Sequence, residues 1–164
     1  MNTLTLAQRV LEAVGADESR LPVPRIVSRI PDALKTLAVM VAGDPRRTLL
    51  RKEFTLTLVS GVGDLTPLVT GDGLLVPSMA AVFAADFTSP LQRQPDFAAL
   101  LTARSPVFGY YAVEGLVLKT ANVEDGDLNF VASFVPTLDT LPEQLSDDLV
   151  SALASFFAPA VAAA

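Results

Sequence analysis

The chain has 164 residues, a formal net charge of −6 and a pI of about 4.5. It contains no cysteine and no histidine, which excludes disulfides, zinc fingers, thiol nucleophiles and the general base that enzymes use most often. The acidic balance argues against a protein that grips nucleic acid, because such a protein needs a basic face to displace counterions from the phosphates.

Hydrophobic residues make up 51% of the chain and charged residues 18%, which is more apolar than an ordinary soluble monomer of this size needs. No uninterrupted apolar run reaches the roughly 18 residues of a membrane span. The nearest, Gly73–Phe87, carries Pro77, Ser78 and Asp86. The N-terminus has no basic region ahead of an apolar stretch, so we expect no signal peptide. The remaining explanation is surface buried between subunits, which predicts an oligomer made inside the cell, without a membrane.

Two helices are predicted near the N-terminus. The first covers Thr5–Val14 and begins at a capping box formed by Thr5 and Gln8. The second covers Val23–Ala42, where Pro31 either kinks the helix or restarts it. The apolar face of the first helix is predicted to comprise Leu4, Ala7, Val10, Leu11 and Val14.

The spacing of the apolar residues then changes from a helical repeat to strict alternation. Lys52–Gly61 alternates apolar and polar residues, which predicts a half-buried strand with Phe54, Leu56 and Leu58 on one face. The glycine-rich residues 61–73 are expected to form a loop. Prolines closely bound Met79–Phe87, which favours a strand there, and Asp96 is expected to cap a short helix over Asp96–Ala103.

Three further strands are predicted as an antiparallel meander. They cover Val107–Val113, Leu116–Thr120 and Leu128–Val135, with a tight turn at Glu114-Gly115 between the first two.

The closing element is predicted to be a long helix. Thr140 and Glu143 have the spacing of a capping box, and Pro159 is expected to end the helix. Its apolar stripe is predicted to comprise Leu141, Leu145, Leu149, Val150, Leu153 and Phe156.

This order predicts an α+β fold, in which an antiparallel β region is inserted into a small helical bundle of two N-terminal helices and a long C-terminal helix. We expect one domain, with helical residues 3–43 and 140–158, a β-rich insertion over 52–136, and a short apolar tail over 159–164.

Few constellations of residues indicate chemistry. Gly61 and Gly63 have a GxG spacing, but Pro67 and further glycines follow where a phosphate-binding helix would open, so a turn is the better interpretation. Glu124 and its acidic neighbours are too closely bunched for a calcium loop, which favours a solvated hairpin tip. No residues assemble a nucleophile, a base and an oxyanion stabiliser, so we expect no catalysis, no metal and no cofactor.

The basic residues allow two interpretations. Arg46, Arg47, Arg51 and Lys52 form either a solvated helix-to-strand junction or a docking surface for an acidic partner or passing DNA. The aromatic pair Tyr110 and Tyr111 point to opposite faces of one strand, which predicts one tyrosine in the core and one at the surface or an interface.

The chain also matches a known order of segments. The N-terminal helices carry LPVPRIVSRIPDALKTLA, followed by the strand KEFTLTLVSGVGDL and the segment VPSMAAVFAADFTSPLQRQP. The short helix FAALL, the strand pair YYAVEGLVLKT and the closing run FVPTLDTLPEQLSDDLVSALASFF come after them. In the order and spacing of these segments, the chain resembles the head-to-tail adaptor (head completion, connector) proteins of tailed bacteriophages.

This resemblance implies a structural protein of the virion neck, made in the host cytoplasm. It implies a homo-oligomeric ring of about twelve copies beneath the portal protein, which extends the DNA channel and presents a surface to the tail or the next neck protein. DNA would pass through such a channel without specific binding, since like charges repel. The candidate subunit or neck interface comprises Tyr110, Tyr111, Glu114, Phe130, Arg46, Arg47 and Arg51, and the candidate portal-docking tail comprises Phe157, Ala158, Pro159 and Val161.

Two other functions stay open. A small-molecule or lipid-binding α+β module would use the apolar excess to line a pocket. A hydrolase would need two carboxylates to converge in a cleft, for which Asp64, Asp72 and Asp86 are the loop candidates.

Overall fold

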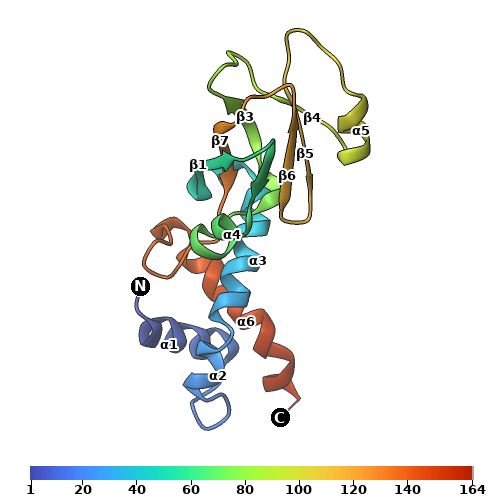
Figure 1. Ribbon diagram of the computed structural model, residues 1–164. Coiled ribbons are helices and arrows are strands. Elements are labelled where there is room, and N and C mark those ends of the chain that lie inside the picture. Colours follow the sequence, from blue (N-terminus) through green and yellow to red (C-terminus); the bar gives the residue numbers. More distant parts are fainter. Residues whose placement is uncertain (164) are drawn as a thin grey trace. The chain divides into compact units, whose positions relative to one another are not determined.

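The computed structural model describes residues 1–163, and the chain divides into two compact units. Unit 1 combines Met1–Leu50 with Val135–Ala164, and unit 2 is Arg51–Phe134. Unit 1 is built of helices and unit 2 of two sheets with short helices, so the α+β class predicted from the sequence is confirmed (Figure 1).

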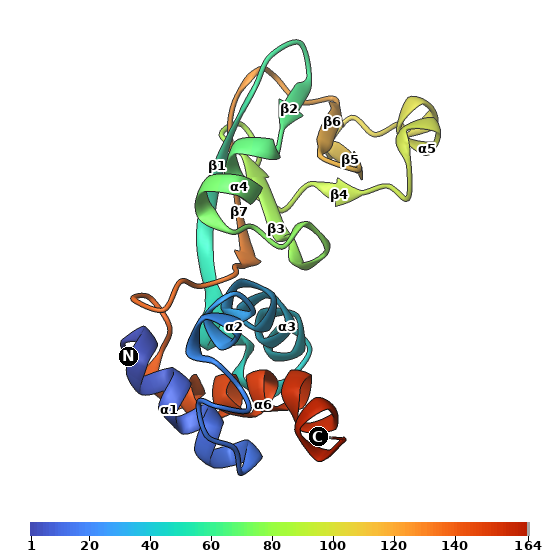
Figure 2. The same ribbon diagram turned by 90° about the horizontal axis from the view of Figure 1, so that it is seen from below.

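Unit 1 places its last helix against its first and third. α6 packs on both α1 and α3, as the two views show (Figures 1 and 2). The fully buried side chains of this unit include Leu6, Leu37 and Leu153. Its elements are α1 (Thr3–Val14), α2 (Val23–Val27), α3 (Ile30–Ala42), the 3-10 turns η1 (Pro45–Leu50) and η3 (Glu143–Leu145), and α6 (Ser146–Ala162).

The first helix begins earlier than predicted. Its N-cap is Asn2, whose side-chain oxygen accepts a hydrogen bond from the backbone N–H of Thr5 at 2.8 Å. The predicted capping box at Thr5 and Gln8 is therefore wrong, because the side chain of Asn2 already satisfies a free N–H group of the first turn. The buried face also differs, since Leu6 is buried and Leu4 faces solvent.

Pro31 restarts the second helix, which was one of the two predicted outcomes. α2 ends at Val27, and Pro31 lies in the first turn of α3, where its missing N–H would have had no partner within the helix. The buried face of α3 comprises Ile30, Ala33, Leu34, Leu37, Ala38 and Val41.

The last helix differs from its prediction at both ends. No side chain caps its N-terminus, and the Thr140 hydroxyl instead accepts a hydrogen bond from the N–H of Thr137 at 2.9 Å. Pro159 lies inside α6, which continues to Ala162. A proline removes only its own N–H from the helical hydrogen bonds, and the three residues that follow it keep the helix here. The predicted tail is thus helical through Ala162, and residue 164 lies outside the described residues.

The helical stretch Glu143–Ala162 is long and apolar enough to cross a membrane, judged by length and composition alone. Its most apolar 18 residues have a mean hydropathy of 1.3, and 28% of them are buried. Within this fold, its Leu149 and Leu153 side chains are fully buried among the helices of unit 1. Asp148 in its first turn forms an ion pair with Arg46. The stretch therefore serves as the central helix of unit 1.

Unit 2 consists of two sheets with strand orders β1-β7-β3 and β2-β6-β5-β4. All pairs are antiparallel except β4 with β5. Buried side chains of both sheets, such as Leu56 of one and Leu118 of the other, form one core cluster. The elements are β1 (Arg51–Leu58), β2 (Val62–Asp64), α4 (Thr66–Asp72), the 3-10 turn η2 (Val76–Ser78), β3 (Ala80–Ala84), β4 (Gln92–Arg93), α5 (Phe97–Thr102), β5 (Tyr110–Glu114), β6 (Val117–Ala121) and β7 (Gly126–Ser133).

Several local predictions for this unit are confirmed. β1 buries the predicted Phe54, Leu56 and Leu58. The strand over β3 is present, and the carboxylate of Asp96 caps α5 by accepting a hydrogen bond from the N–H of Ala99 at 2.7 Å.

Two predictions for unit 2 are wrong. The predicted loop over residues 61–73 contains β2 and α4. The predicted meander breaks after β6, because β7 leaves β6 and pairs with β1 and β3 in the other sheet. The register with β1 sets Phe130 opposite Phe54 and Leu128 opposite Leu56, so the apolar faces of both strands point into one core.

Candidate functional site

The two tyrosines of the candidate interface are both buried within unit 2. Tyr111 faces the main core, and Tyr110 lies on the other face of β5 with Leu100 of α5. The Tyr110 hydroxyl donates a hydrogen bond to the carbonyl of Arg104 at 3.1 Å, and burial raises the pKa of the Tyr111 hydroxyl. The opposite orientation is confirmed, but the expectation of one surface tyrosine is wrong, because α5 covers the second face of β5 (Figure 1).

Phe130 is also inside the unit and is only 1% exposed. Its ring stacks on Phe54 with 5.5 Å between centroids and an interplanar angle of 12°. Glu114, by contrast, is exposed at the end of β5, and its carboxylate accepts a hydrogen bond from the N–H of Phe97 at 3.4 Å. Among these candidate residues of the hairpin and its neighbours, only Glu114 is therefore available at the surface.

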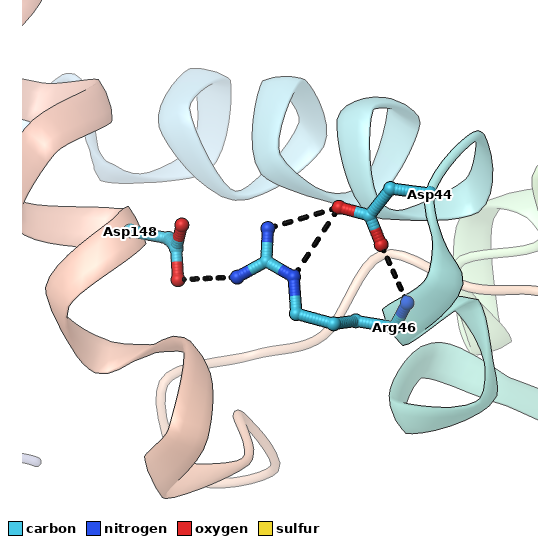
Figure 3. Close-up of polar contacts among 3 residues, drawn as sticks. All are labelled: Asp44, Arg46 and Asp148. Carbon is cyan, nitrogen blue, oxygen red and sulfur yellow. Dashed lines mark hydrogen bonds and ion pairs between the residues drawn. The ribbon is translucent and has the colours of Figure 1, made fainter.

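The basic residues are divided between the two units. Arg46 and Arg47 belong to η1 in unit 1, and Arg51 is the first residue of β1 in unit 2. The Arg46 guanidinium lies between Asp44, at 2.9 Å, and Asp148 of α6, at 2.8 Å (Figure 3). Its charge is thus offset by two carboxylates, and its role in unit 1 is to tie the end of α3 to the start of α6.

This contact carries a testable consequence for pH. Hydrogen bonding to Arg46 lowers the pKa of Asp44, so Asp44 stabilises the fold above its ordinary pKa of about 4, and that stability is lost as the pH falls through the lower folded value. We expect Arg46→Gln to raise the pKa of Asp44 part of the way back, since the backbone N–H of residue 46 still donates to Asp44. An NMR titration of the side-chain carboxyl measures this shift.

The matched control is Arg47→Gln, which removes an adjacent exposed cation that forms no ion pair with Asp44. An Asp44 pKa that stays the same in both variants contradicts the role assigned to Arg46.

The candidate tail is part of α6. Phe157 is buried, with the guanidinium of Arg25 at 5.9 Å from its ring centroid, so it is held in unit 1 rather than offered to a partner. The carbonyl of Val161 accepts a hydrogen bond from Arg20 at 3.0 Å. Ala158 and Pro159 are exposed on the last turns of the helix.

Unit 2 holds an open pocket of about 660 Å³ that sequence analysis did not identify; we call it the basic groove. Its two charged lining residues are Lys119 and Arg104. The ammonium of Lys119 lies 4.6 Å from the ring centroid of Phe97, and Arg104 donates to the carbonyls of Leu101 and Ala103. The lining comprises Ser60, Gly61, Val62, Phe97, Ala98, Leu100, Leu101, Arg104, Lys119, Thr120 and Ala121.

A second pocket in unit 2, of about 580 Å³, carries the opposite charge; we call it the acidic pocket. Its charged lining residues are Asp86 and Glu124, both exposed. Asn122, at a positive φ of 58°, holds its wall by donating to the carbonyls of Ser105 and Phe108. The lining comprises Asp86, Phe87, Thr88, Ser89, Pro106, Val107, Asn122, Val123 and Glu124.

The acidic loop between β6 and β7, next to this pocket, has a partly structural role. The carboxylate of Asp125 accepts hydrogen bonds from the N–H groups of Ser60 and Gly61 at 2.7 and 2.8 Å, and so fixes the turn between β1 and β2. Asp64 likewise accepts from the N–H of Thr66 at the start of α4, and hydrogen bonding to Thr66 lowers its pKa. Within residues 1–163, no group of three or more acidic side chains is placed to hold a metal ion.

No protein-family model matches this sequence, and a search of curated proteins finds no significant match.

Proposed function

We propose that this chain is a structural protein of a phage neck, which forms a ring beneath the portal and connects the head to the tail. The observation that carries the proposal is the large apolar side chains left uncovered on unit 2. Leu101 is 77% exposed, Val59 is 69% exposed and Val107 is 65% exposed.

Uncovered apolar side chains support assembly because covering each of them with another surface lowers the free energy of the assembled state. Burying a Val or Leu side chain fully contributes about 1.5–3 kcal/mol, and an isolated subunit forgoes this gain. Unit 1 also has such residues, with Val39 and Met40 exposed on α3 and Phe156 exposed on α6. Contacts between subunits would use these side chains, in keeping with the apolar excess of the composition.

The order of the elements supports a connector in particular. Helices from both ends of the chain form unit 1, and the β-rich unit 2 is inserted between α3 and α6. This is the order of the adaptor proteins that the sequence resembles, including the β5–β6 hairpin that precedes the long last helix.

The charge of the chain suits a channel for DNA. Unit 2 has five Lys or Arg against nine Asp or Glu, a net charge of −4. An acidic wall repels the phosphate backbone, so DNA would slide past without being bound. The partners in this proposal are copies of the chain in a ring of about twelve, the portal, and the tail or next neck protein.

A second function is favoured by one observation. The basic groove has about 660 Å³ and a partly apolar lining, within the roughly 300–1,000 Å³ of pockets that take small molecules. A small-molecule or lipid-binding module would hold an apolar or anionic ligand there. Such a protein would stay a monomer or dimer and would be stabilised by its ligand.

Mass photometry of the chain, alone and with portal rings from the same genome, separates the two functions. We expect either a ring by itself or a portal whose mass rises by a whole set of subunits. The control is an unrelated portal, which is expected to gain no mass. A monomer that leaves its own portal unchanged contradicts the proposed connector.

A further inference from the structure

Unit 2 carries two surfaces of opposite charge that share no lining residue. The two surfaces use neighbouring positions of the same two segments. Arg104 and Ala121 line the basic groove, and Pro106 and Asn122 line the acidic pocket. Both are thus bordered by the segment between α5 and β5 and by the end of β6. Each also has a strongly exposed apolar residue, Leu101 in the groove and Val107 in the pocket.

The charges of both surfaces lack ionic partners in their own chain. Among residues 1–163, every ion pair lies in unit 1. In the groove, Lys119 lies over an aromatic ring and Arg104 donates to carbonyl groups, so neither meets a carboxylate. In the acidic pocket, Asp86 and Glu124 form no ion pair, and no Lys or Arg is in the lining.

We propose that the acidic pocket surface of one copy docks on the basic groove of the next copy. In this contact Asp86 and Glu124 face Lys119 and Arg104, while Val107 and Leu101 lose their contact with water. The proposal rests on the proposed ring, and it names the surfaces by which neighbouring subunits bind.

The contact is head-to-tail, because in the proposed ring each copy uses its groove on one neighbour and its pocket on the other. A pair of copies then keeps one free groove at one end and one free pocket at the other, and the contact repeats until the rotation between copies closes a ring. Complementary charges fix the order of the subunits and disfavour groove-to-groove or pocket-to-pocket contacts, since like charges would meet there.

Charge reversal tests this pairing. One variant reverses the groove (Arg104→Glu with Lys119→Glu) and another reverses the pocket (Asp86→Lys with Glu124→Lys). We expect each alone to associate roughly a hundredfold more weakly than the wild type, because both of its surfaces then have the same sign. The measurement is sedimentation velocity over a range of concentrations, with and without portal rings, after circular dichroism has shown that each variant is folded.

Restoration is the decisive result. Mixing the two variants is expected to recover assembly, since the reversed groove of one then meets the reversed pocket of the other. A single chain with all four changes is expected to assemble by itself. Lys35→Glu and Asp72→Lys, exposed charges outside both surfaces, serve as matched controls and are expected to assemble like the wild type.

The outcomes separate this inference from the proposed function. Rings that persist in both reversed variants, or a mixture that fails to recover assembly, overturn the pairing while the ring stands. A wild-type chain that is monomeric both alone and with its portal overturns the ring and the pairing together. Stabilisation of that monomer by an anionic amphiphile such as decanoate, lost on Lys119→Glu, would assign the groove to a ligand instead.

Discussion

Phe130→Ala is expected to lower the free energy of unfolding by about 3–5 kcal/mol, the usual cost of truncating a buried phenylalanine. The ring of Phe130 is 1% exposed and stacks on Phe54 across the β1–β7 pair. Its removal leaves a cavity in the core cluster shared by the two sheets of unit 2 and also ends the aromatic contact. Urea unfolding followed by circular dichroism measures the loss.

The matched control is Phe156→Ala, because Phe156 is a phenylalanine exposed on α6. It is expected to cost less than about 1 kcal/mol. A Phe130 variant as stable as the wild type that no longer assembles would contradict the buried position, and would restore Phe130 to the subunit interface suggested by the sequence.

Gly63→Ala is expected to lower the free energy of unfolding by about 1–3 kcal/mol, as overpacking of a core usually does. A Cβ on residue 63 would lie 2.5 Å from Cδ2 and 2.9 Å from Cγ of Leu56. Gly63 in β2 and Leu56 in β1 belong to different sheets, and Leu56 is held in the core between them. The added methyl group would therefore push the sheets apart or force Leu56 from its rotamer.

A double-mutant cycle with Leu56→Ala isolates this contact. The cost of Gly63→Ala is expected to shrink in the Leu56→Ala background, because the clashing atoms are gone. Gly71→Ala is the control, since Gly71 lies in α4 and its new Cβ would meet no atom within 4 Å. That change is expected to be neutral or stabilising. If Gly63→Ala costs the same in both backgrounds, the close approach of the sheets is contradicted.

Local patterns in the sequence predicted elements whose partners are close in the chain. The alternation in β1 reflects a strand with one buried face, and Asp96 and Pro31 act on the turns that directly follow them. These features depend on backbone geometry within a few residues, so they are readable without the fold.

Contacts between distant segments were harder to predict. The alternation of apolar and polar residues in β7 would suit the third strand of a meander equally well. Only the matching apolar face of β1, about 70 residues earlier, decides which sheet β7 joins. Both tyrosines of β5 are buried. α5 covers the face that carries Tyr110, and the β1-β7-β3 sheet covers the face that carries Tyr111. A strand pattern shows that two faces exist, and it does not show what covers them.

The basic groove was missed for the same reason. Lys119 and Arg104 are 15 positions apart and are joined only when α5 lies beside β6. One signal was present, since the adjacent Leu100 and Leu101 in a short helix cannot both face the core. Leu100 is buried, and Leu101 is the most exposed large apolar residue of unit 2.

Negative-stain electron microscopy of the chain mixed with portal rings from its own genome shows directly whether the chain is a connector. A connector is expected to give portal rings with an added second tier, in which the number of subunits can be counted. Portal rings without that tier, beside a chain that stays monomeric at the same concentration, would contradict it.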